Sequence, residues 1–131
     1  MRIETTEDAQ QRVRQGERWL DDHMPDWEQR IDTTILNISN ARCCVLGQLG
    51  ATDQGRFVIT GDFHDVKDYY NLTADDCERY GFSIKARDYV IPNYGEMNWQ
   101  AMDWLTVAWR TVIQERRLAK ERDADRELVG V

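Results

Sequence analysis

The sequence predicts an α+β fold that is predominantly helical, with several short helices and one long C-terminal helix around a minor sheet of two or three strands. Apolar residues recur at helical spacing near both ends of the chain. Short runs rich in β-branched and aromatic residues lie between turn residues in the middle, which is typical of strands. We therefore expect a single globular domain over residues 1–114 and a charged helical extension or tail over residues 115–131.

The first helix is predicted from about Thr6 to Asp22. Thr5 or Thr6 provides the N-cap, and the acidic residues Glu7 and Asp8 follow in the first turn, where carboxylates interact favourably with the helix dipole. A helical period places five small or apolar residues on one inward face: Ala9, Val13, Gly16, Trp19 and Leu20.

A short helical turn is predicted after this helix, because proline is favoured at the first position of a helix. Pro25 takes that position, and the turn carries Trp27 and Ile31. The next apolar segment, residues 35–39, is too short to classify by its period. Either an extended piece or a turn closing onto the core fits it.

Three more short helices are predicted from caps and spacing. Ser39 or Asn40 caps a compact apolar helix over residues 43–49, and apolar residues recur at helical spacing over residues 62–70. Thr73, with an acidic residue three positions later, opens the last of them, and Gly81 closes it.

Three short runs have the composition of strands. Residues 57–60 and 89–91 are rich in β-branched and aromatic side chains, and residues 82–86 alternate apolar with polar. Pro92 stops the last run because proline restricts the residue before it and cannot donate a ladder hydrogen bond. Together these runs predict the minor sheet.

The clearest prediction is a long helix that starts after a cap at Asn98 and continues to about Leu128 without glycine or proline. From residue 115 onward most side chains are charged, with both signs mixed, so we expect this part to extend into solvent. The inward face of the helix is predicted to comprise Met102, Leu105, Trp109, Val112 and Ile113.

A second, largely apolar stripe lies on the other side of the same helix and comprises Trp104, Val107, Thr111 and Leu118. A helix covered on one side only would not carry it. Either the helix is central and covered on both sides, or the stripe binds a protein partner or a second copy of the chain. Because Leu118 lies beyond the end of the inward face, we identify these four residues as candidate partner-binding residues.

The charge balance argues against direct binding of nucleic acid. The chain has 17 basic and 24 acidic residues, a net charge of −7, and no clustered basic stripe, whereas nucleic-acid grooves are positively charged. Acidic residues concentrate over residues 21–32 and 62–78. They fit ordinary solubility, and they also fit an acidic mimic of nucleic acid that binds a basic protein.

The sequence also argues against membrane association. No apolar run approaches the ~18 residues that a membrane-spanning helix needs. The first eight residues lack the basic start and apolar middle of a signal peptide. We therefore expect a cytoplasmic location.

Few residues offer catalytic chemistry. Cys43, Cys44 and Cys77 lack the spacing of a zinc site and are interpreted as buried small hydrophobic residues. His64 and Asp68 are four residues apart, which places them on one helix face but supplies no third ligand. We expect no catalytic residues, no metal site and no cofactor.

Six short motifs occur in order along the chain: Gly16-Glu17-Arg18-Trp19-Leu20-Asp21, Pro25-Asp26-Trp27, Arg30-Ile31-Asp32, Cys44-Val45-Leu46-Gly47-Gln48-Leu49, Tyr80-Gly81-Phe82 and Leu105-Thr106-Val107-Ala108-Trp109-Arg110. Together they resemble a family of small uncharacterised proteins encoded by actinobacteriophages and by prophages or genomes of their hosts. The resemblance extends to about Ile113, and neither residues 83–98 nor the charged tail has a counterpart in it. It implies no activity and transfers no catalytic residues, so the motifs are interpreted as packing and turn signals.

The resemblance and the missing catalytic motif favour a small phage accessory protein of the host cytoplasm that acts by binding a host or defence protein. One alternative is a metal- or thiol-dependent enzyme that uses His64, Asp68 and the cysteines. Another is a structural component of the virion.

Overall fold

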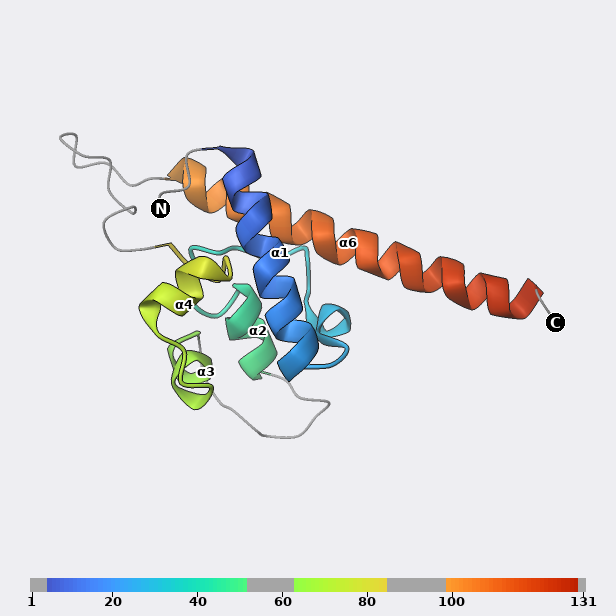
Figure 1. Ribbon diagram of the computed structural model, residues 1–131, viewed down its shortest axis with the longest axis horizontal. Helices are drawn as coiled ribbons and strands as arrows, with labels where there is room; N and C mark the ends of the chain where they lie inside the picture. The colour runs from blue at the N-terminus through green and yellow to red at the C-terminus, as the bar shows by residue number, and fades with distance from the viewer. Residues whose placement is uncertain (1–4, 52–62, 85–98, 130–131) are drawn as a thin grey trace.

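The computed structural model describes residues 5–51, 63–84 and 99–129, and Figure 1 shows how their helices are arranged. None of the described helices combines the length and apolar composition needed to cross a membrane. In chain order the described elements are α1 (Thr6–His23), the 3₁₀ helix η1 (Trp27–Arg30), α2 (Val45–Ala51), α3 (Phe63–Tyr69), α4 (Ala74–Arg79) and α6 (Trp99–Val129).

Helices α1 and α4 begin where the sequence predicts them, because their caps are built from local side chains. Two other starts differ from the prediction: Asp26 and not Pro25 directly precedes η1, and α2 begins at Val45 and not at residue 43. Thr5 accepts a hydrogen bond from the backbone of Asp8 at 3.1 Å, and the Asp8 carboxylate accepts one from the backbone of Thr5 at 3.1 Å. Thr73 and Asp76 repeat this arrangement at the start of α4, with both distances 3.0 Å. Hydrogen bonds from Thr73 hold the pKa of the Asp76 carboxyl below its usual value.

The predicted α+β class is wrong, because the residues that the structure describes form helices and irregular segments and no strand. The predicted strands at 57–60 and 89–91 lie outside the described residues. The third run begins inside them, and there Phe82 and Ile84 are both buried in an irregular segment that follows α4.

The alternation of apolar and polar residues that begins at Phe82 does not reflect a strand. Gly81 takes the left-handed conformation, with φ of +70°, and ends α4. The backbone of Phe82 then donates to the carbonyl of Cys77 at 2.9 Å, so the chain turns back over the helix that it has just left. Phe82 and Ile84 therefore face the helical core.

The main layer of the fold is formed by α1 and α6, which cross at a close contact (Figure 1). Gly16 on α1 makes this approach possible: a Cβ atom there would lie 2.0 Å from the carbonyl oxygen of Tyr80 and 2.8 Å from the indole of Trp109. Trp109 of α6 passes under Gly16 and donates its Nε1 hydrogen to the carbonyl of Gly81 at 2.7 Å.

Aromatic side chains fill the core beneath this crossing. The ring of Trp109 stacks on Phe82, with centroids 5.7 Å apart, and meets Trp27 edge-on at 5.8 Å. All three side chains are buried, and Leu20 and Leu105 are buried beside them. The inward face predicted for α1 is confirmed, since its five members are buried.

The segment 31–44 has no regular secondary structure and is fixed by side chains from neighbouring helices. Gln48 of α2 accepts from the backbone of Asp32 at 2.7 Å and donates to its carbonyl at 3.2 Å. Thr106 of α6 accepts from the backbone of Ile38 at 3.1 Å. Residues 35–39 therefore form turns that lie against α6, one of the two possibilities that the sequence leaves open.

Replacing Gly16 with alanine tests the crossing of α1 and α6. We expect the free energy of unfolding to fall by about 1–3 kcal/mol, because the added methyl group meets a backbone carbonyl that cannot rotate away. At an exposed helical position the same change would stabilise the protein by roughly 1 kcal/mol. Urea denaturation measures the difference, and Gln15→Ala, at the neighbouring exposed position, is the control. An unchanged or increased stability of Gly16→Ala would contradict this role.

Candidate functional site

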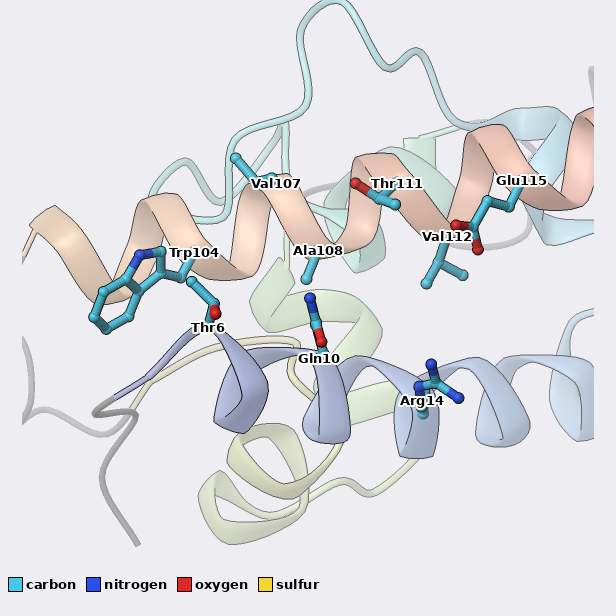
Figure 2. Close-up of a pocket in the computed structure, with 9 residues that line it drawn as sticks. All are labelled: Thr6, Gln10, Arg14, Trp104, Val107, Ala108, Thr111, Val112 and Glu115. Carbon is cyan, nitrogen blue, oxygen red and sulfur yellow. The ribbon is translucent and has the colours of Figure 1, made fainter.

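A groove of about 370 Å³ runs between α1 and α6 (Figure 2). Its volume lies within the range of ligand sites, but the groove is open along one side. The wall from α6 is mostly apolar and the wall from α1 is polar. The lining residues are Thr6, Gln10 and Arg14 from α1, and Trp104, Val107, Ala108, Thr111, Val112 and Glu115 from α6.

The groove follows from the spacing of side chains on the two helices. Thr6, Gln10 and Arg14 recur every fourth residue, so they form one ridge along the exposed flank of α1, while the inward face of that helix packs against the core. Ala108 lies opposite the middle of this ridge and has a small side chain. The ridges of the two helices therefore do not interdigitate there, and the space between them stays open.

The structure brings three of the four candidate partner-binding residues together. Trp104, Val107 and Thr111 line the groove, whereas Leu118 lies further along α6 and does not line it. Val107 is 55% exposed and Leu118 is 56% exposed, so the described part of the chain does not cover this side of α6. Trp104 is half-buried and packs against the edge of the core.

Opposite charges flank one end of the groove. Arg14 stands on the α1 wall and Glu115 on the α6 wall, with Val112 between them at the base (Figure 2). Both charged side chains are exposed. The indole of Trp104 lies at the other end, beside Thr6. The groove therefore has an apolar end and an end with mixed charge.

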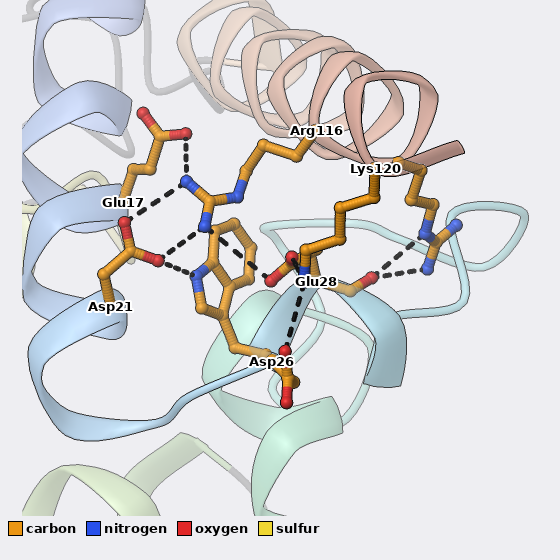
Figure 3. A network of polar contacts seen from close by, with 8 residues as sticks. Glu17, Asp21, Asp26, Glu28, Arg116 and Lys120 are labelled. Atoms are coloured by element: carbon orange, nitrogen blue, oxygen red, sulfur yellow. Dashed lines mark hydrogen bonds and ion pairs between the residues drawn. The ribbon is translucent and has the colours of Figure 1, made fainter. Parts of the chain in front are cut away.

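Beyond the groove, Arg116 ties α6 to α1 (Figure 3). Its guanidinium donates to Glu17 at 2.8 Å and to Asp21 at 2.6 Å, and it lies 5.2 Å from the centroid of the Trp27 ring. Trp27 in turn donates its Nε1 hydrogen to Asp21 at 3.0 Å. One carboxylate therefore joins an arginine of α6 to a buried tryptophan of η1.

Lys120 and Arg117 tie α6 to η1 on the same side of the molecule. Glu28 is 1% exposed, and its carboxylate forms an ion pair with Lys120 and lies 3.8 Å from Arg116. Arg117 donates to the backbone carbonyl of Glu28 at 2.7 Å and also to that of Ile31. The cationic side chains are thus fixed by a buried carboxylate and by backbone oxygens.

The protonation states of the two cations agree with this arrangement. Burial lowers the pKa of the Arg116 guanidinium, but hydrogen bonds to Glu17 and Asp21 outweigh burial, and the pKa is raised overall. A hydrogen bond to Glu28, with a second one to Asp26, raises the pKa of Lys120. Both groups therefore remain charged at neutral pH.

Sequence reasoning missed this cluster of polar contacts, since it expected the charged residues after residue 114 to extend into solvent. Contacts of α6 with α1 and η1 continue to Lys120, and residues 121–124 are exposed. The sequence does indicate that two cations lie on one face of the helix, because Arg116 and Lys120 are four residues apart. Their acidic partners lie about a hundred residues earlier, and spacing alone does not reveal that contact.

The cysteines and histidines are not gathered into a reactive site in the described residues. Burial raises the pKa of Cys44 to about 11 and that of Cys77 to about 12, so both thiols are protonated at neutral pH. His23 stacks on Trp19 with ring centroids 4.1 Å apart. Within the described residues, no group of three or more His, Cys, Asp or Glu side chains is placed to hold a metal ion.

Comparisons with protein-family models, curated proteins and solved structures find no match to this chain.

Replacing Glu28 with glutamine tests the polar contacts between α6 and η1. The amide keeps the shape of the side chain but removes the charge that faces Lys120 and Arg116. We expect the free energy of unfolding to fall by about 1–3 kcal/mol, because the buried carboxylate of Glu28 loses its charge-assisted contact with Lys120 and the amide makes a weaker neutral one. Glu121→Gln, at an exposed position of α6, is the control and should change stability by less than about 0.5 kcal/mol. Equal effects of the two substitutions would show that the contacts of Glu28 do not stabilise the fold.

Proposed function

We propose that this chain is a small accessory protein that acts by binding another protein through one side of α6. The observation that carries the proposal is the exposed stripe formed by Val107, Thr111 and Leu118, which continues into the groove at Trp104. Exposed apolar side chains that recur along one face of a rigid helix are typical of protein interfaces.

The rigidity of α6 supports this function. Trp109 anchors the helix at the crossing with α1, and Arg116, Arg117 and Lys120 fix it further along. A helix that is already held in place loses little conformational entropy when a partner binds. The stripe therefore lies on a rigid element rather than on a loop.

The chemistry of the surface supports a protein target. The net charge of −7 disfavours direct contact with nucleic acid, whose backbone is also negative. Because the sequence motifs resemble those of small phage proteins, the target that we propose is a host or defence protein, and the proposed location is the cytoplasm of the host cell. The raised pKa values of Cys44 and Cys77 make both residues poor nucleophiles, which favours binding over thiol chemistry.

A crosslinking pull-down from an actinobacterial lysate tests the proposal. The variant Val107→Glu/Leu118→Glu places charges at two exposed positions, so we expect the chain to fold. The amount of partner that it captures should fall by about tenfold or more. The control, Ile35→Glu/Tyr69→Glu, alters side chains of similar exposure, 51% and 60%, on other segments. It should keep the partner. A partner retained by both variants, or lost by both, would refute the assignment to this stripe.

A further inference from the structure

We propose that the groove between α1 and α6 binds a second copy of this chain, so that two chains form a two-fold dimer across their α1–α6 layers. The inference rests on the proposed function, since it names one partner of the same side of α6. Val107 and Thr111 belong both to the groove and to the exposed stripe, so the second copy and the other target compete for this side of α6, and only Leu118 lies outside the groove.

The charged residues at one end of the groove favour a two-fold dimer. Arg14 and Glu115 stand on opposite walls at the same end of the groove (Figure 2). A two-fold axis along the groove places Arg14 of one chain against Glu115 of the other, and the reverse contact follows by symmetry. The surface is therefore complementary to itself.

The same arrangement disfavours partners whose charge has one sign. A nucleic acid or a uniformly basic segment would meet an attractive charge on one wall and a repulsive charge on the other. The chain that binds here must place an acidic group opposite Arg14 and a basic group opposite Glu115. A second copy supplies that pattern by symmetry, because Arg14 and Glu115 are exposed on opposite walls of the groove (Figure 2).

The apolar end of the groove also favours a two-fold dimer. The axis that pairs the charges also brings the Trp104 side chains of both chains to the same end, on either side of the axis. Val107 is 55% exposed there, and the small side chain of Ala108 leaves room for a neighbouring ring. Aromatic side chains in such positions dominate the binding energy of many interfaces.

A dimer of standard size needs more surface than the groove alone. It buries roughly 800 Å² per partner, about a tenth of the surface of a small protein and of the 8402 Å² that this chain exposes. Stacking one α1–α6 layer on another gives a four-helix arrangement, in which helices pack efficiently. The dimer thus continues the helix packing of the single chain.

The test is the mass of the purified chain by sedimentation over concentrations on the order of 1–500 µM. We expect the mass to rise from 15.4 kDa toward twice that value. Arg14→Glu and Glu115→Arg should each raise the dimer dissociation constant about tenfold or more, because each creates like-charge contacts twice per dimer. The double variant Arg14→Glu/Glu115→Arg should return it to within about threefold of the original value. Arg18→Glu, exposed on α1 outside the groove, is the control.

A chain that stays monomeric at every concentration overturns the proposal. So does a dimer that tolerates both single reversals, or a double variant that does not recover. Circular dichroism verifies that each variant keeps its helical content. If the chain is monomeric but the pull-down still captures a protein that Val107→Glu/Leu118→Glu loses, the dimer is refuted and the proposed function stands. If the chain dimerises as expected and captures no other protein, the host target is refuted and the dimer stands.

Discussion

The structure depends on the close approach of α1 and α6 at Gly16. A glycine at this position allows the indole of Trp109 to pass beneath α1 and to donate to the carbonyl of Gly81, which joins α1, α6 and the end of α4 at one point. The stack of Trp109 on Phe82 and its edge contact with Trp27 then fix the aromatic core. Because the crossing sets the separation of the two helices, it also sets the width of the groove beside them.

A second constraint holds the long helix beyond the crossing. Most of the stability of a helix in a protein comes from tertiary packing, so α6, which has 31 residues, depends on contacts along its length. Arg116 and Lys120 supply these contacts through Glu17, Asp21 and the buried carboxylate of Glu28. The helix thus meets the rest of the described chain through an aromatic anchor and a cluster of charges, and none of the described segments covers its other side.

Elements with local signals could be predicted from the sequence. The capping boxes at Thr5 and Thr73, and the absence of glycine and proline in α6, specify helices through contacts only a few residues apart. The sheet was wrongly predicted, because alternating burial at Phe82 and Ile84 arises from an irregular segment lying on helices. The helical spacing of apolar residues predicts the exposed stripe of α6. The sequence does not show that Arg14 and Glu115 lie at the same end of a groove, because only the packing of α1 against α6 brings them there.

The groove and the exposed stripe are consequences of this packing, since they lie on the side of α6 that the described chain leaves uncovered. Hydroxyl-radical footprinting of the purified chain at low and high concentration tests most directly whether another protein chain covers that side. If another chain covers that side, Trp104 and Val107 become protected from oxidation at high concentration. Tyr69, which is 60% exposed on α3, reacts equally at both concentrations. Unchanged reactivity of Trp104 and Val107, or equal protection of Tyr69, would contradict it.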